Sequence, residues 1–180
     1  LSWFERPDPT ALKAALTDAV DTIAVVHHET TTGLLNDLPA VAEVARATGR
    51  RLLVDSVSGL GGETLDFGQV SPDAVCCTAN KCIQGLPGIA FVLLRRAMPL
   101  IRRSVYLDLG LALAKQSVGD TPFTPAIQVL AALEVALDEL IEETVPGRIA
   151  RYRRASERVR ATAARLGLAL MLPPALLSHT

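Results

Sequence analysis

The sequence RRLLVDSVSG, residues 50–59, contains the strand around which the rest of the chain can be arranged. Its segment from Arg51 to Val54 is typical of a buried strand and ends at Asp55, which small residues follow. A helical pattern of apolar positions covers residues 38–48 just before it and stops at Gly49. The stretch therefore predicts a helix followed by a buried strand whose end carries a carboxylate.

The same alternation continues in both directions along the chain. Residues 8–19 begin with a helix N-cap and have helical spacing. Three more runs, at 22–26, 74–78 and 89–94, predict strands. Strands that alternate with helices favour an α/β fold with a mostly parallel sheet and helices on both faces.

The character of the sequence changes in its last third. Two long helices are predicted at 125–143 and 146–166, followed by an apolar strand at 168–172. We therefore expect residues 1–143 to form part of a large domain. Residues 144–180 would form a linking helix and the beginning of a smaller C-terminal domain.

The composition is that of a globular protein without a strong electrostatic preference. Hydrophobic residues make up 49% of the chain, and 18 basic and 19 acidic residues are interspersed. This excludes the basic surface typical of nucleic-acid or membrane binding and favours a small-molecule site. The apolar runs are too short or too interrupted to span a membrane. Three crowded cysteines predict reduced thiols, so we expect a soluble, cytoplasmic protein, and both ends of the chain look cut.

Ligands of open α/β sheets bind beyond the carboxyl ends of the strands, so the residues that follow each strand are the ones to inspect. Segment 27–33 offers hydroxyls and amides to an oxygen-rich or aromatic ligand, or it is a turn before a helix cap at Asn36 or Asp37. Asp55 is costly to bury unless donors or a cation meet it, and a protonated ring nitrogen is a suitable partner. The alternative is a carboxylate that caps its loop or pairs with a surface arginine.

Lys81 stands between the strand at 74–78 and a turn that contains glycine and proline. Such a lysine can form a Schiff base with an aldehyde cofactor, whereas a lone surface lysine is usually only solvated. An acid for a ring nitrogen, a lysine for an aldehyde and hydroxyls for a phosphate are together the parts that pyridoxal phosphate chemistry requires. We therefore predict pyridoxal 5'-phosphate as the cofactor, and we expect no metal site.

Three segments resemble the class V aminotransferases of pyridoxal phosphate fold type I: HHETTTGLLNDL, RRLLVDSVSG and TANKCIQGLPGIAFVLLRR. The resemblance runs from about Val25 to Arg96 and continues more weakly to residues 123–125. Asp55 and Lys81 are 26 positions apart, which is similar to the family's separation of ring-nitrogen acid and Schiff-base lysine. The resemblance implies a pyridoxal phosphate-dependent transaminase.

Four site residues take their roles from this resemblance. Lys81 would be the Schiff-base lysine and the proton carrier of the reaction. Asp55 would keep the pyridine nitrogen protonated. Thr30 would lie near the ring and its 3-hydroxyl, with Ser58 as a weaker candidate for the same oxygen.

The resemblance also implies the residues around the phosphate. Thr78 corresponds to a phosphate-binding hydroxyl, and Asn80 flanks it. Thr124 resembles a threonine that reaches the phosphate from the neighbouring subunit, which implies a homodimer with shared active sites. One departure is His28, which stands where the family has a cysteine. The family's phosphate loop lies upstream of this chain, and its substrate-binding arginine lies beyond Thr180.

Within the family, the resemblance is closest to members that transfer the amino group of 2-aminoethylphosphonate to pyruvate, giving phosphonoacetaldehyde and alanine. The small-molecule partners would then be an amino donor and a 2-oxo acid acceptor. An alanine or serine:glyoxylate aminotransferase is the alternative. Asn80, where a cysteine desulfurase has histidine, disfavours that relative. A non-catalytic fragment or dimerisation module of the same fold is the alternative from another class.

Two other groups are interpreted as structural. The cysteines are expected in the core, because Cys76 and Cys77 are adjacent on a strand and point to opposite faces, which does not suit a zinc site. The arginines from Arg148 to Arg158 are expected to form a solvated helix face that offsets acids such as Glu142 and Glu143.

Overall fold

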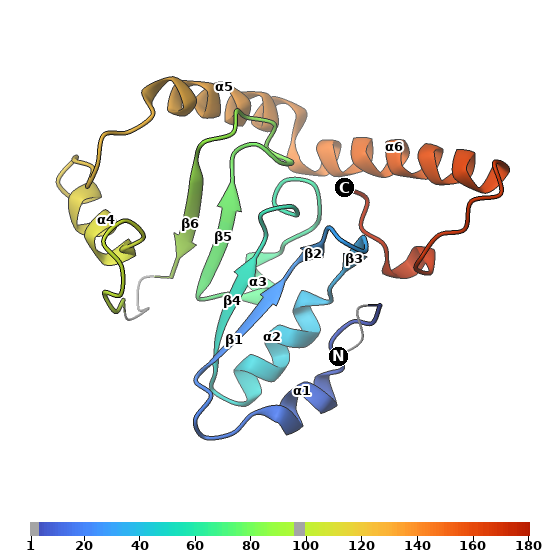
Figure 1. The fold of residues 1–180 in the computed structure, drawn as a ribbon, viewed down its shortest axis with the longest axis horizontal. Coiled ribbons are helices and arrows are strands. Elements are labelled where there is room, and N and C mark those ends of the chain that lie inside the picture. Colours follow the sequence, from blue (N-terminus) through green and yellow to red (C-terminus); the bar gives the residue numbers. More distant parts are fainter. Residues whose placement is uncertain (1–3, 96–99) are drawn as a thin grey trace.

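The structure is a computed structural model that describes residues 4–95 and 100–180 (Figure 1). Two sequence-based interpretations fall outside the described residues. These are the cut appearance of the first three residues, and Arg96, with which the family-like stretch ends. The described residues form an α/β fold in which strands and helices alternate through the first half of the chain.

The central sheet has four strands in the order β1, β4, β5, β6. Its members are β1 (Thr22–Val26), β4 (Arg51–Asp55), β5 (Ala74–Thr78) and β6 (Ala90–Leu94). The first three are parallel, and β6 pairs with β5 antiparallel. Val26 pairs with Asp55, and Asp55 pairs with Cys76, so the parallel strands end at one edge of the sheet. The prediction of a mostly parallel sheet is confirmed.

Helix α2 (Leu38–Ala47) packs on one face of this sheet. Asp37 is its N-cap, since Asp37 Oδ1 accepts a hydrogen bond from Ala40 N at 3.1 Å, and Gly49 follows its end with a φ of 63°. The core between helix and sheet contains Leu38, Val41, Ala42, Val44 and Ala45 of the helix, with Ile23, Leu52, Val54, Val75 and Cys77 of the strands. The short helices α1 (Pro9–Ala15) and α3 (Phe67–Val70) pack against α2.

The opposite face of the sheet is less covered than we expected. Ala24 and Cys76 are exposed on it, so no helix of the described chain covers the sheet at these two positions. The prediction that all three cysteines are core residues is therefore wrong for Cys76, while Cys77 and Cys82 are buried. The reason is the alternation of the strand, which turns Cys77 toward α2 and Cys76 away from it.

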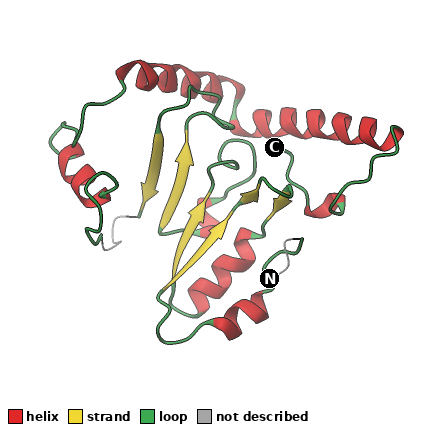
Figure 2. Ribbon diagram, in the orientation of Figure 1, coloured by secondary structure: helices red, strands yellow, loops and turns green. Residues whose placement is uncertain are grey.

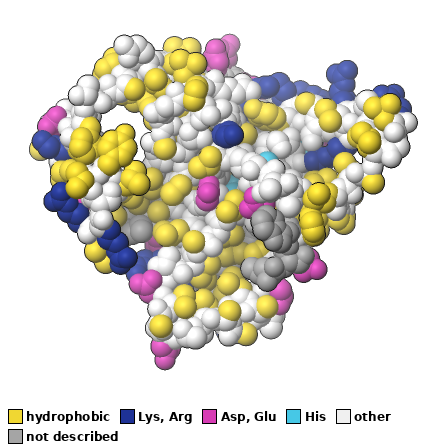
Figure 3. All heavy atoms as spheres, in the orientation of Figure 1, with side chains coloured by type: hydrophobic (Ala, Val, Ile, Leu, Met, Phe, Trp, Pro, Cys, Tyr) yellow, Lys and Arg dark blue, Asp and Glu magenta, His cyan; other side chains and the backbone are white. Residues whose placement is uncertain are grey.

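Two long helices, α5 (Ile127–Glu143) and α6 (Val145–Arg165), meet at Thr144, whose φ of 64° changes the direction of the chain. They run past the end of the sheet at which the parallel strands stop (Figures 1 and 2). The preceding helix, α4 (Leu109–Gln116), was not predicted. Figure 3 shows hydrophobic side chains over α4 and α5, and the exposed ones include Leu113, Ile127, Leu130, Val135, Leu137 and Ile141. Within the described ranges, no helix is both long and apolar enough to cross a membrane.

The predicted strand at 168–172 does not form. Leu168, Leu170 and Met171 are exposed, and the chain continues into a short 3-10 helix, η1 (Pro174–Leu176). The run pairs with no strand among the described residues, and two prolines follow it. Apolar residues alone do not make a strand unless a neighbouring edge accepts the backbone hydrogen bonds.

A small hairpin follows β1 and was not predicted either. Its strands are β2 (His28–Glu29) and β3 (Leu34–Leu35), which pair antiparallel. Gly33, with a φ of 79°, completes the turn between them. The hairpin lies at the edge of the sheet where the parallel strands end, and it carries Thr30 there.

Candidate active site

Asp55 is the last residue of β4, and its side chain is exposed. Its Oδ1 accepts a hydrogen bond from Val57 N at 3.0 Å, so the carboxylate caps its own loop with one oxygen. Register with Cys76 places the Asp55 side chain on the face of the sheet that Cys76 and Thr78 also share. Burial and, to a smaller extent, the negative charge of Asp55 raise the pKa of the Cys76 thiol. The strand end therefore offers an acid with a free oxygen.

Lys81 is exposed in the turn that follows β5. Its carbonyl accepts from Gln84 N at 2.8 Å, and Gly85 N donates to the carbonyl of Ala79 at 2.8 Å, which closes the turn. Three of its neighbours are buried, with exposed fractions of 0% for Ala79, 5% for Cys82 and 3% for Ile83. The turn therefore presents an accessible amine on a backbone that buried residues hold in place.

Thr78 and Asn80 contact each other beside Lys81. Thr78 Oγ1 lies 2.7 Å from Asn80 Oδ1 and 3.0 Å from the carbonyl oxygen of Ile89. Because a hydroxyl has one proton, Thr78 donates to one of these oxygens, and a bound phosphate would have to replace it. Asn80 is exposed, so its amide is accessible from solvent.

The other three predicted residues lie in different surroundings. Thr30 is exposed in the turn between β2 and β3. Ser58 Oγ donates to the carbonyl of His28 at 2.9 Å, which joins this hairpin to the loop that follows Asp55. Thr124 is exposed just before α5, and no hydrogen bond joins it to the other predicted residues in the described chain. The structure thus brings Thr30 and Ser58 to the edge with Asp55 and Lys81.

A buried histidine that the sequence did not single out by itself lies beneath this edge. His27 is 2% exposed, and its Nδ1 is 3.0 Å from Ser56 Oγ. Its backbone N–H donates to the carbonyl of Asp55 at 2.7 Å. Burial lowers the pKa of His27 and also that of His28, so the neutral imidazole is favoured in both. His27 therefore supports the Asp55 loop through its bonds to Ser56 Oγ and to the carbonyl of Asp55.

Arg148 contradicts the prediction of a solvated arginine face. It is 2% exposed, and its Nη1 donates to the carbonyls of Cys82 and Ile83, both at 3.1 Å. Its Nε donates to Glu143 Oε2 at 2.6 Å. The face prediction holds for Arg153, Arg154 and Arg158, which are exposed. A cation in the first turn of a helix is unfavourable next to the helix dipole, and this position could have indicated a specific partner.

Glu143 is the acid that the arginines offset, as expected. Arg151 donates to both of its oxygens, with Nε at 2.6 Å from Oε1 and Nη2 at 2.9 Å from Oε2. Hydrogen bonds from Arg151 and then from Arg148 lower the pKa of Glu143 to about 2. Glu143 is therefore ionised near neutral pH.

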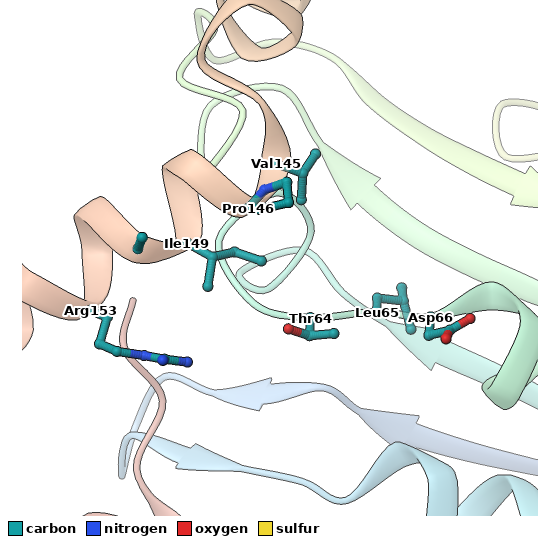
Figure 4. A pocket seen from close by; sticks show the side chains of 8 residues that line it. Thr64, Leu65, Asp66, Val145, Pro146, Ile149 and Arg153 are labelled. Carbon is teal, nitrogen blue, oxygen red and sulfur yellow. The ribbon is translucent and has the colours of Figure 1, made fainter.

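A cavity of about 390 Å³ lies between the start of α6 and the loop at 64–66 (Figure 4). In Figure 4, Ile149 and Arg153 extend from α6 toward Thr64 and Asp66. Its lining consists of Thr64, Leu65, Asp66, Val145, Pro146, Ile149, Ala150 and Arg153. None of the predicted site residues lines this cavity, so it is separate from the strand-end residues.

Known relatives of the chain point to one family. Residues 4–104 match the family described as aminotransferase class-V. The chain is 40% identical over 179 residues to the 2-aminoethylphosphonate–pyruvate transaminase of Aeromonas hydrophila, and 38% identical over 180 residues to that of Klebsiella pneumoniae. These matches cover 93% and 95% of this chain but 47% and 49% of the relatives. The chain therefore spans about half the length of these relatives.

Solved structures agree with this result. The chain superimposes on alanine–glyoxylate aminotransferase from Nostoc with a TM-score of 0.91 and 26% identity, covering 100% of this chain and 50% of that one. Pyridoxamine-pyruvate aminotransferase from Mesorhizobium loti gives a TM-score of 0.85 and 25% identity, covering 100% and 49%. The prediction of pyridoxal phosphate fold type I is confirmed. Since the family match extends over more than half of its length, the chain belongs to the class V aminotransferases.

Proposed function

We propose that the protein is a pyridoxal 5'-phosphate-dependent aminotransferase whose reacting lysine is Lys81. The observation that carries this proposal is the shared edge of β4 and β5, where the exposed Asp55 carboxylate ends β4 and the exposed Lys81 amine lies in the turn after β5. The donor set fits the cofactor in chemistry, because an acid and an amine are both accessible to a ligand at that edge. When bound, pyridoxal 5'-phosphate supplies an aldehyde that takes up an amino group and a ring that withdraws electrons.

Each predicted residue has a proposed task at this edge. Lys81 would hold the aldehyde of the cofactor and would carry the proton of the amino-group transfer. Asp55, through the oxygen that does not cap its loop, would keep the ring nitrogen protonated. Thr30 and, more weakly, Ser58 lie near the ring hydroxyl, although Ser58 Oγ would have to release the carbonyl of His28.

The phosphate would be held by the two polar residues that directly precede Lys81 on either side of Ala79. Thr78 and Asn80, already in contact at 2.7 Å, would donate to it once their mutual hydrogen bond is exchanged. We assign Thr124 to the phosphate of a second copy of the chain, in a homodimer with shared sites. Its exposure just before α5 leaves its hydroxyl accessible to a second copy, which supports this role.

The proposed substrates are 2-aminoethylphosphonate as amino donor and pyruvate as acceptor, with phosphonoacetaldehyde and alanine as products. Identities of 40% and 38% to transaminases of that name support this choice over alanine or serine:glyoxylate transfer. The 26% identity to an alanine–glyoxylate aminotransferase keeps the second activity as the alternative. A non-catalytic module of the same fold is the alternative from outside the enzymes.

Two organisational proposals accompany this function. We propose a boundary between a partial large domain at 1–143 and the beginning of a small domain at 144–180. The change of direction at Thr144, between α5 and α6, supports that boundary. We also propose a cytoplasmic location, which the reduced cysteines support.

The decisive experiment is reduction with borohydride in the presence of pyridoxal 5'-phosphate, followed by peptide mass mapping of the protein in its natural length. These 180 residues contain three lysines, Lys13, Lys81 and Lys115, and peptide mapping distinguishes an adduct on Lys81 from one on either of the others. We expect a pyridoxyl adduct on Lys81, its loss in Lys81→Ala, and its retention in the matched control Lys13→Ala. An unmodified Lys81 in the wild-type protein would refute the cofactor assignment and favour the non-catalytic alternative.

The substrate is tested separately by a donor screen. Wild-type protein is supplied with 2-aminoethylphosphonate, alanine or serine, together with pyruvate or glyoxylate, and the amino products are quantified. We expect the fastest transfer from 2-aminoethylphosphonate to pyruvate. Transfer from alanine or serine to glyoxylate without turnover of the aminophosphonate would establish the alternative substrate pair.

A further inference from the structure

The turn that carries Lys81 is held from one side by the corner between α5 and α6. Arg148 Nη1 donates to the carbonyls of Cys82 and Ile83, the two residues that directly follow Lys81, at 3.1 Å each. The arginine is 2% exposed and balanced by Glu143, whose Oε2 accepts from Arg148 Nε at 2.6 Å. A buried guanidinium is stable only where acceptors meet its donors, so these bonds define where the turn lies.

Further contacts extend this support to the next residue of the turn. Gln84 Nε2 donates to Tyr152 Oη at 3.0 Å, and Arg151 Nη2 lies 3.4 Å from Gln84 Oε1. Gln84 has a φ of 68°, a backbone conformation that residues other than glycine seldom adopt unless their surroundings hold them in it. Helix α6 therefore contacts three consecutive residues after Lys81.

The other side of the turn packs against the loop that follows Asp55. Cys82 Sγ lies 3.3 Å from the carbonyl of Ser58. A methyl group placed on Gly62 would lie 2.6 Å from Cys82 Sγ, so only glycine allows this close approach. The Lys81 turn is thus fixed between the Asp55 loop and Arg148, while the lysine side chain itself remains exposed.

We propose that Arg148 is a positioning residue for Lys81: by binding the carbonyls of Cys82 and Ile83, it fixes the backbone from which the reacting amine extends. The inference rests on the proposed function of Lys81. The same guanidinium belongs to α6 and binds the turn, so the position of the turn backbone depends on α6. If Arg148 had only a structural role, its loss would lower the stability of the fold without changing the reaction of Lys81 with an aldehyde.

The test compares Arg148→Gln, Arg148→Lys and a matched control, Arg154→Gln, in the natural-length protein. Arg154 is exposed on the same helix and has no bond to the turn, so its substitution removes the same charge without touching Lys81. Pyridoxal 5'-phosphate is titrated by absorbance, and the fraction of Lys81 trapped by borohydride is measured per folded molecule. Amide hydrogen exchange of residues 82–85 is followed in cofactor-free protein.

We expect Arg148→Gln to weaken pyridoxal phosphate binding roughly tenfold to a hundredfold, the loss typical of a displaced reacting group. Arg148→Lys, which keeps the charge but not the fixed two-carbonyl geometry, should recover part of it. Arg154→Gln should match the wild type. Exchange at residues 82–85 should rise in Arg148→Gln without a comparable rise in the strands.

Three results separate the possible failures. If Lys81 is trapped equally per folded molecule in Arg148→Gln and wild type, the positioning role is refuted while the proposed function stands. If the wild type forms no adduct, the proposed function fails, and the inference fails with it. If Arg148→Gln does not fold, Arg148→Lys and Glu143→Gln decide, since wild-type affinity in both variants would overturn the inference.

Discussion

Gly59 offers a sharp test of how the Asp55 loop is built, through the substitution Gly59→Ala. A methyl group at this position would lie 2.5 Å from His27 Nδ1, 3.0 Å from His27 Cγ and 3.1 Å from Ser56 Oγ. The imidazole would have to retreat by about 0.9 Å to restore ordinary contact, although it is 2% exposed and bonded to Ser56. Overpacking of this kind costs about 1–3 kcal/mol.

The backbone on both sides resists that retreat. The His27 N–H donates to the carbonyl of Asp55 at 2.7 Å, and the carbonyl of Gly59 accepts from Glu63 N at 2.8 Å. We therefore expect Gly59→Ala to lower the free energy of unfolding by about 2 kcal/mol. Urea denaturation followed by circular dichroism measures this through the transition midpoint at unchanged slope.

A double-mutant cycle identifies the cause. If the methyl group of Gly59→Ala collides with the imidazole, the substitution should cost at least about 1 kcal/mol less in a His27→Ala background. Additive costs, within about 0.5 kcal/mol, would show that the imidazole is not the obstacle and would refute the reasoning. Because His27 holds the Asp55 backbone, Gly59→Ala should also weaken pyridoxal phosphate binding if Asp55 has its proposed role.

Three other outcomes are expected from the same structure. Leu38 is 2% exposed in the core, so Leu38→Ala should lower the free energy of unfolding by about 2–5 kcal/mol in the same urea assay. The control Leu166→Ala, at a position that is 71% exposed, should lower it by less than about 0.5 kcal/mol. Burial lowers the pKa of His27 from 6.5, so below pH 6.5 unfolding takes up a proton; the free energy of unfolding should be constant above pH 6.5 and fall below it by up to about 1.4 kcal/mol per pH unit. Urea midpoints measured between pH 5 and 8 should depend less on pH in His27→Asn than in the wild type. The same pH dependence in both proteins would contradict the prediction. Ser178 Oγ donates to Glu63 Oε1 at 2.7 Å, so Glu63→Ala should lower the free energy of unfolding by about 1.5–3 kcal/mol. Amide hydrogen exchange near Ser178 should become faster, and unchanged protection there would count against the contact.

Local patterns predicted the strands and helix caps well, because their causes are local. The strands at 22–26 and 74–78 were predicted with the bounds that the structure has. The cap of α2 was correctly placed at Asn36 or Asp37, and the structure selects Asp37. Runs of β-branched and other apolar residues predict strands, and a carboxylate three residues before a free N–H predicts a helix cap. Both act through neighbours in the chain, so no tertiary contact is needed to recognise them.

Predictions failed where the deciding partner lies far away in the sequence. The apolar run at 168–172 had a strand's composition, but it pairs with no strand of the described chain. Arg148 had the composition of a solvated face, but its acceptors are 66 and 65 positions away. Burial of Cys77 and exposure of Cys76 depended on which face of the sheet α2 covers.

The sequence by itself determined the reacting groups and their order, since Asp55 and Lys81 each follow an apolar run and the family motifs surround both. Only the tertiary structure decided that the two strands are neighbours, that His27 supports the Asp55 loop, and that Arg148 supports the Lys81 turn. The physical reason is that a residue's identity fixes what it can donate or accept. Burial and long-range packing decide which of its partners it meets.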